Sequence, residues 1–343
     1  MKFLRASALV IFAFVILAVA TASHAYAQGT PITVRFTVQP KTLVTTLVEL
    51  AVEKGFFREA GIDAKTVTVQ HGPAAVTALA SGSVDVATNA PEVFLALAGK
   101  GQSLKLIAGQ TRQLGVFAVR PGLDAPAGFP DSVKALKGKK IGVTALSSAT
   151  QYLATAMLNS AGLDATDVEF IAVGTGAPQA LAARHVDAAV LTGPQIETSQ
   201  MLGARSIIDL RSKTNCPGAL DICGISQVGM WAMGDWIAKN REAVQRIRRA
   251  IAKADLFLHD PVNAAFAKEF LGSHISADMS GEVRAGYIQG ALTVLAADFS
   301  KHDLERWIAI DFKGGVITQR MPVADVFADG TPESPQSVKD LAR

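Results

Sequence analysis

The sequence predicts an α/β protein built from two similar halves. Apolar, strand-like segments alternate with helix-like segments along most of the chain, which is the pattern of βα units. ALASGSVDVA at residues 78–87 partly recurs as ALAARHVDAA at residues 180–189, and AGIDA at residues 60–64 returns as AGLDA at residues 161–165. The two matches share nearly the same offset, which favours a duplicated unit. Chance similarity in an alanine-rich chain is the alternative.

The length and charge of the chain limit the possible partners. The 343 residues are enough for about two domains. The 33 basic residues fall to 31 when Lys2 and Arg5, in a segment expected to be removed, are left out, against 30 acidic residues. A nearly neutral chain argues against nucleic acid or an anionic membrane surface as a partner.

Residues 1–27 have the composition of a signal peptide. Lys2 and Arg5 precede an apolar run at residues 8–20, and Ala25-Tyr26-Ala27 is an A-x-A cleavage site. We expect cleavage before Gln28 and an exported protein that is soluble in the periplasm. An uncleaved anchor is the alternative.

Cys216 and Cys223 are the only two cysteines, and they lie close together in the sequence. Pro217 and Gly218 between them can turn the chain, so in an oxidising compartment we expect a disulfide that holds a loop. The histidines have no metal-ligand spacing with each other or with the cysteines, so no metal site is expected.

The first half of the chain should contain five strands, at residues 32–38, 66–69, 84–87, 104–108 and 115–120. Helices follow the first three strands. Thr42 can cap the first helix, and Asn89 can start the third with Pro91 as its first helical residue. The second helix should end at Gly82, because glycine often terminates helices.

The second half repeats this order. Strands are expected at residues 139–144 and 168–173, a further strand should end at residue 191, and another is expected at residues 228–233. A helix is expected over residues 150–160, and Thr192-Gly193-Pro194 should open another. The chain after residue 235 should be mostly helical, and the polar tail after Gly330 should be loosely held.

This order of elements predicts two lobes that the chain joins twice. The crossings are expected near residues 109–114 and 227–231. Residues 28–112 and 229–330 would form the first lobe, residues 113–228 the second, and residues 331–343 a polar tail. Two crossings make a hinge, so the lobes could close on a ligand.

The sequence resembles the substrate-binding proteins of ABC importers for nitrate, sulfonates and taurine, with the related thiamine-precursor binders. The resemblance rests on VEKGFFREAGID at residues 52–63, ALASGSVDVA, LKGKKIGV at residues 136–143 and VDAAV at residues 186–190. It implies a type II periplasmic-binding-protein fold, a small-molecule ligand, no cofactor, and an ABC permease in the inner membrane as partner. The segment after the first strand reads Gln39-Pro40-Lys41-Thr42-Leu43-Val44 and departs from the family's usual P-x-Y-V-A, so the ligand class is open.

Candidate ligand-binding residues follow the predicted strands, where helix N-termini offer free amides. They are Gln39, His71, Asn89, Ala90, Ser147, Ser148, Thr150, Thr175 and Thr192, with Arg112 and Trp231 near the crossings. Such sites suit a nitrate, sulfonate or carboxylate. The alternatives are that Ser, Thr and Asn only cap their own helices, that Arg112 is a solvated hinge residue, and that Trp231 packs between the lobes.

No motif of a catalytic site is present. The chain has no P-loop, no G-x-S-x-G, no H-E-x-x-H, and neither cysteine lies near a histidine that could serve as its base. Together with the family resemblance, which implies delivery of a solute to an ABC importer, this leads us to expect a monomeric, non-enzymatic periplasmic protein that binds a small, anionic solute. The alternatives are a ligand-presenting sensor for a membrane receptor and an enzyme similar to thiamine-pyrimidine synthase.

Overall fold

The computed structural model describes residues 30–343 except 213–216, 218–219 and 276–278. The predicted signal peptide at residues 1–27 lies outside the described residues. Among the residues that are described, no helix is both long and apolar enough to cross a membrane.

The first part of the chain forms a parallel βα arrangement. Its elements are β1 (Ile32–Val38), α2 (Thr46–Glu53), α3 (Phe56–Glu59), β2 (Ile62–Thr68), α4 (Gly72–Ala80), β3 (Ala87–Asn89), α5 (Pro91–Ala98) and β4 (Leu104–Arg112). β1 pairs with β2 in parallel, and a parallel bridge joins Phe36 of β1 to Val86 on its other side. The first strand therefore lies between the second strand and the start of the third.

The next part repeats this arrangement within a five-stranded sheet. Its elements are β5 (Val116–Val119), α6 (Asp131–Lys134), β6 (Lys140–Val143), α7 (Ala149–Ser160), β7 (Glu169–Ala172), α8 (Ala177–Ala182), β8 (Ala188–Leu191), α9 (Pro194–Met201) and β9 (Arg205–Asp209). The strand order is β7-β6-β8-β5-β9, and β6 pairs in parallel with both β7 and β8. Among the three parallel strands β7, β6 and β8, β6 lies in the middle although it comes first in the sequence, as β1 does in the first part.

The aspartate of the repeated VD dipeptide makes the same kinds of contact in both halves. The Asp85 carboxylate accepts the backbone N–H of Arg35 at 2.8 Å and pairs with the Arg35 guanidinium at 2.7 Å. The Asp187 carboxylate accepts the backbone N–H of Lys140 at 3.1 Å and pairs with Arg120 at 2.9 Å. In each half the aspartate thus ties the segment before β3 or β8 to the backbone of a parallel strand, β1 or β6.

The five-stranded sheet is covered on both faces. Phe117, Val119, Ala188 and Val190 point into one apolar cluster with α7, whereas Val116, Ala118, Ala189 and Leu191 point into another with α8 and α9. This strict alternation follows from the two-residue period of a strand. Helices on both faces explain why these strands are apolar throughout.

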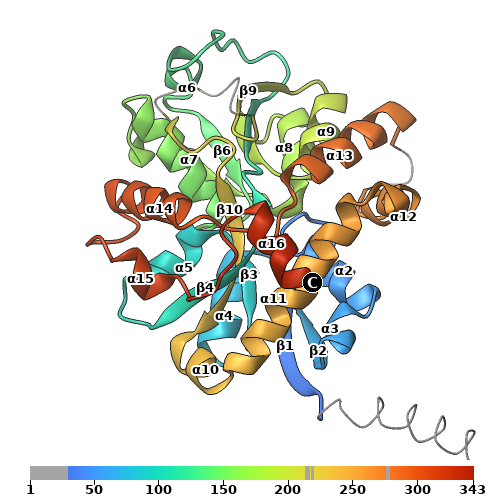
Figure 1. The fold of residues 1–343 in the computed structure, drawn as a ribbon. Helices are drawn as coiled ribbons and strands as arrows, with labels where there is room; N and C mark the ends of the chain where they lie inside the picture. The colour runs from blue at the N-terminus through green and yellow to red at the C-terminus, as the bar shows by residue number, and fades with distance from the viewer. Residues whose placement is uncertain (1–29, 213–216, 218–219, 276–278) are drawn as a thin grey trace, which may run out of the picture.

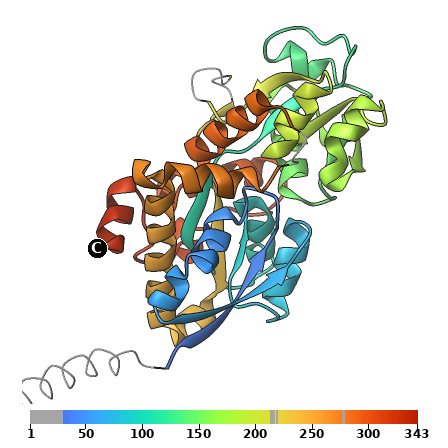
Figure 2. The same cartoon turned by 90° about the vertical axis from the view of Figure 1, so that its right-hand side faces the viewer.

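A long antiparallel strand returns the chain to the first sheets. β10 (Ser226–Met233) lies between β3 and β4 and pairs with both in antiparallel fashion. We call β1–β4, β10 and the helices that cover them the first body, and the five-stranded sheet with α6–α9 the second body. Figure 1 shows the second body in green and yellow above the blue and cyan strands of the first, and Figure 2 shows the same division from the side.

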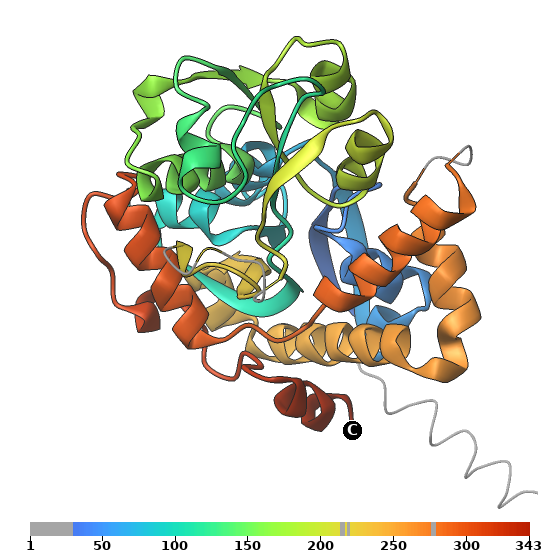
Figure 3. The ribbon, with the colours of Figure 1, turned by 90° about the horizontal axis from the view of Figure 1, so that it is seen from above.

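The rest of the chain is helical, as predicted. It comprises α10 (Gly234–Lys239), α11 (Arg241–His259), α12 (Ala264–Gly272), α13 (Gly281–Val294), α14 (Lys301–Lys313), α15 (Val323–Val326) and α16 (Pro335–Ala342). The prediction of a loosely held tail is wrong, because α16 packs along α11 (Figure 3) and buries Val338. Ser334 and Ser337 form a capping box at its start.

Two predicted helix starts are also displaced. The first helix begins at Thr46 and not after Thr42, because residues 40–45 form turns in which Lys41 has a φ of 61°. Asn89 ends β3, and Ala90 is the N-cap of α5, although Pro91 is the first helical residue as predicted.

Candidate functional site

Two connected cavities lie where the strand ends of both bodies meet. The larger one, which we call the outer cleft, has a volume of about 640 Å³, and the smaller one, the inner pocket, about 50 Å³. Gln39, Val44, Thr144 and Thr192 line both. The bodies approach closely here, since a β-carbon on Gly193 of the second body would lie 3.5 Å from Leu43 Cγ of the first.

The first body contributes the starts of α4 and α5 to the inner pocket. His71, Gly72, Asn89 and Ala90 line it. His71 is the N-cap of α4, and its Nδ1 accepts the backbone N–H of Ala74 at 3.3 Å. The neutral ring therefore carries its proton on Nε2, which makes Nε2 a hydrogen-bond donor.

Asn89 reaches the same pocket from the end of β3. Its Oδ1 accepts the N–H of Ala90 at 3.0 Å, and its backbone pairs with Gly229 of β10. Asn89 caps no helix, so the capping alternative does not describe it.

Gln39 is held at the boundary of the two cavities by its backbone. Its N–H donates to Thr45 Oγ1 at 2.9 Å, and Thr45 Oγ1 donates to Glu49 Oε1 at 2.6 Å. The side chain is almost fully buried, and its Oε1 has no hydrogen-bond partner. A buried amide oxygen without a partner is costly, so Gln39 is a strong candidate for contact with a bound molecule.

The second body contributes a cluster of three hydroxyls at the start of α7. Thr144 Oγ1 lies 3.1 Å from Ser148 Oγ and 2.7 Å from Thr150 Oγ1, and the last two lie 2.9 Å apart. Ser148 is the N-cap residue of α7, yet its side chain makes no capping hydrogen bond. The hydroxyls therefore face one another and the inner pocket, and do not only cap the helix.

Thr175 and Thr192 line the outer cleft from the second body. Thr175 is exposed in the turn before α8, and Thr192 precedes Gly193, the N-cap of α9. The side chain of Gln195 joins these two loops, since its Oε1 accepts from Thr192 N–H at 3.3 Å and its Nε2 donates to the Gly174 carbonyl at 3.4 Å.

The linings of both cavities contain no carboxylate among the described residues. Lys41 and His274 are the ionisable side chains of the outer cleft, and His71 is that of the inner pocket. Burial lowers the pKa of His274, which favours its neutral form. The rest of the outer cleft combines amides and hydroxyls with apolar side chains such as Met201, Leu202 and Ile275.

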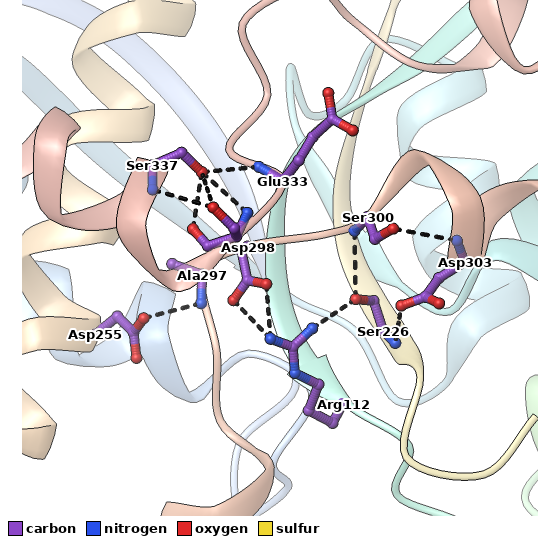
Figure 4. A network of polar contacts seen from close by, with 10 residues as sticks. Arg112, Ser226, Asp255, Ala297, Asp298, Ser300, Asp303, Glu333 and Ser337 are labelled. Carbon is purple, nitrogen blue, oxygen red and sulfur yellow. Dashed lines mark hydrogen bonds and ion pairs between the residues drawn. The ribbon is translucent and has the colours of Figure 1, made fainter.

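Arg112 does not line these cavities. β4 continues through residue 112, and the Arg112 guanidinium pairs with Asp298 at 2.6 Å and donates to Ser226 Oγ at 2.7 Å. Figure 4 shows the guanidinium pointing toward both partners. Its charge is thus used in holding β4, β10 and the segment before α14 together.

Trp231 and Ser147 also lie outside both linings. Trp231 is fully buried in β10, and its ring stacks on Phe94 of α5 with centroids 5.2 Å apart. Both residues belong to the first body, so this stacking is packing within that body. Ser147 is exposed with a φ of 58°, and its N–H donates to Gln151 Oε1 at 2.6 Å.

Sequence reasoning missed Thr144 and Gln227 in the inner pocket. Thr144 directly follows β6, so the rule applied to Ser148 could have found it. Gln227 lies inside β10, where its Oε1 accepts the N–H of Leu114 at 2.9 Å. Such a contact between distant residues leaves no sequence signal.

The predicted disulfide involves Cys216, which lies outside the described residues. Cys223 is buried, and the described part of the chain contains no free cysteine. Within that part, no group of three or more His, Cys, Asp or Glu residues could hold a metal ion.

Comparisons with known proteins agree with this architecture. A Brucella abortus (strain 2308) protein named "Putative binding protein BAB2_1146" is 30% identical over 223 residues, which cover 62% of this chain and 63% of that protein. The match thus spans less than two-thirds of that relative's length.

Solved structures resemble the chain over most of its length. The alkanesulfonate-binding protein SsuA from Xanthomonas axonopodis pv. citri, bound to MOPS, has a TM-score of 0.67 at 18% identity, covering 88% of this chain and 99% of SsuA. The periplasmic nitrate-binding protein NrtA from Synechocystis PCC 6803 has a TM-score of 0.68 at 13% identity, covering 91% of this chain and 88% of NrtA. The desulfurization enzyme DSZB is also similar, with a TM-score of 0.59 at 17% identity, covering 91% and 100%. At such identities the likeness establishes the fold alone.

A family model described as NMT1/THI5 like matches residues 43–264, which is more than half of the chain and includes most of the residues that line the inner pocket. The chain therefore belongs to the NMT1/THI5-like family and has the periplasmic-binding-protein fold.

Proposed function

We propose that this chain is a periplasmic solute-binding protein that delivers a small, anionic solute to an ABC permease in the inner membrane. The solute would bind between two lobes, residues 28–112 with 229–330 and residues 113–228. The signal-peptide composition of residues 1–27 supports export. The protein would act as a monomer, without a cofactor and without catalysis.

The observation that carries the proposal is the inner pocket, to which both bodies contribute polar groups. His71 and Asn89 come from the first body, and Ser148, Thr150 and Thr192 from the second. A ligand that touches both sides stabilises the closed arrangement, because only differential contacts shift a conformational equilibrium.

The charge of the lining supports an anionic rather than a cationic ligand. Neither cavity has a described carboxylate that could compensate an ammonium group. α4, α5, α7 and α9 all begin at the linings, and helix N-termini favour negative charge. Two similar folds belong to proteins named for alkanesulfonate and nitrate binding, which supports the same ligand class here.

A thermal-shift screen of the chain from Gln28 onward tests the proposal. The panel contains nitrate, taurine, alkyl and aryl sulfonates, aromatic carboxylates and thiamine precursors, with cationic amines as a contrast. A ligand at 100 times its dissociation constant should stabilise the folded protein by about 2.7 kcal/mol. Stabilisation by one class of anion is expected, whereas stabilisation by amines alone, or by no compound, would refute the proposed ligand class.

A further inference from the structure

Two carboxyl groups are buried on α5 and α14, two helices that pack against each other. Glu92 is the second residue of α5, two residues after Ala90 of the inner pocket, and Asp311 lies in α14. Each residue is 1% exposed. Both Glu92 carboxyl oxygens and Asp311 Oδ2 lack a hydrogen-bond partner. We call Glu92 and Asp311 the acid pair.

Among the described residues, no Lys, Arg or His forms an ion pair with either carboxyl of the acid pair. α4 and β10, which also pack on α5, carry no charged side chain along their length, and Asp325 of α15, which packs on α14, is exposed. The half-buried Tyr152 of α7 also interacts with both carboxyls, and its pKa is raised by burial and by the two acids.

Two negative charges cannot be held together at this position without a large cost. Burial raises the pKa of Glu92 to about 8. Burial and the neighbouring Glu92 also raise the pKa of Asp311 well above its usual value. The acid pair therefore holds its protons to a higher pH than exposed carboxyls do.

The helix that carries Glu92 packs against both bodies. α5 of the first body contacts α14, which carries Asp311, and α7 of the second body. One apolar cluster includes Phe94 of α5, Leu153 of α7 and Trp307 of α14. The same α5 and α7 begin at the inner pocket, so a change at this junction acts on helices that line the pocket from both sides.

We infer that the acid pair is a pH-sensitive latch, in which the protonated carboxyls let α5, α7 and α14 pack closely and their ionisation separates the two bodies. Ionisation would place two uncompensated like charges in apolar surroundings, which favours the entry of water where α5 meets α14 and α7. The latch would thereby regulate closure of the binding cleft, so its role rests on the function proposed above.

The test uses the ligand-free chain from Gln28 onward and its Glu92→Gln variant. Small-angle X-ray scattering at pH 6.5 and pH 9.5 measures the radius of gyration, and circular dichroism verifies folding. We expect the wild-type radius to increase at pH 9.5 and the radius of Glu92→Gln, which cannot ionise at this position, to stay at its pH 6.5 value. Glu305→Gln, an exposed glutamate on α14, is the matched control and should behave as wild type.

A wild-type radius that does not change with pH, or that changes equally in Glu92→Gln, would overturn the inference. If Glu92→Gln does not fold, Asp311→Asn takes its place with the same expectation. Because no ligand is added, a failed search for the solute cannot produce either result.

Discussion

The side chain of Asn89 lies directly against the α-carbon of Gly72. A β-carbon at position 72 would be 2.9 Å from Asn89 Oδ1 and 3.1 Å from its Cγ. Both residues line the inner pocket, so the absence of a side chain at Gly72 allows Asn89 to occupy its place there.

Gly72→Ala should displace Asn89 and weaken ligand binding. The overlap is too close to be absorbed without movement, so we also expect a loss of about 1–3 kcal/mol in unfolding free energy. Calorimetric titration with the solute found in the screen, together with denaturant unfolding, measures both effects. Gly286→Ala is the control, since a β-carbon there meets nothing within 4 Å, and unaltered affinity in Gly72→Ala would contradict the placement of Asn89.

Arg112→Met should destabilise the protein without affecting affinity for the solute. The variant leaves the carboxylate of Asp298, which is 2% exposed, without its partner at 2.6 Å. Breaking such a buried pair costs about 3–5 kcal/mol. Adding Asp298→Asn should recover part of this loss, because the uncompensated charge is then removed. A tenfold weaker affinity in a folded Arg112→Met would instead restore the sequence-based expectation that Arg112 binds the ligand.

Arg184→Gly should stabilise the protein. Arg184 in the second half occupies the position that Gly82 occupies in the first half. Both residues have a left-handed backbone, with a φ of 61° at Arg184 and 71° at Gly82. A left-handed conformation costs a non-glycine residue about 1 kcal/mol, so the variant should unfold at a slightly higher denaturant concentration. Gly82→Arg is the reciprocal variant and should lose a similar amount. Equal midpoints for all three proteins would show that the turn carries no strain.

His259 should make the protein less stable as the pH rises from about 6.5 to 9. Its Nδ1 lies 2.9 Å from Asp255 Oδ1, and the hydrogen bond to Asp255 raises the pKa of His259 to about 9. The folded state thus binds this proton more tightly than the unfolded state. The resulting stabilisation of the folded state is complete below pH 6.5 and is lost as the pH rises to about 9. Melting temperatures of wild type and His259→Asn should differ at pH 6 and converge above pH 9. A constant difference across this range would contradict the ion pair.

The alternation of strands and helices could be predicted from the sequence. The strands form buried sheets and are therefore apolar, and the helices that cover the sheets have one apolar face. Asn89 and Ser148 could be selected as candidate site residues because each lies between a predicted strand and the helix that follows it. The duplicated VD dipeptide also has a structural counterpart, because Asp85 and Asp187 accept a backbone N–H in the same way.

Contacts between distant segments could not be predicted. Arg112 looked available for an anion because Asp298, its partner, is 186 residues away. The tail after Gly330 is polar in sequence, yet α16 packs on α11 and buries Val338. The acid pair likewise comes from two helices far apart in the sequence, α5 and α14, and neither Glu92 nor Asp311 carries a local sign of burial.

The central claim is that polar groups from both bodies hold the solute, and a calorimetric titration of Ser148→Ala tests it most directly. Ser148 is 2% exposed and lines the inner pocket, whereas its exposed neighbour Ser147 does not, so Ser147→Ala is the matched control. Loss of one hydrogen bond to a charged ligand should weaken binding roughly tenfold or more in Ser148→Ala and leave Ser147→Ala at the wild-type affinity. Equal affinities for all three proteins would contradict a ligand site between the two bodies.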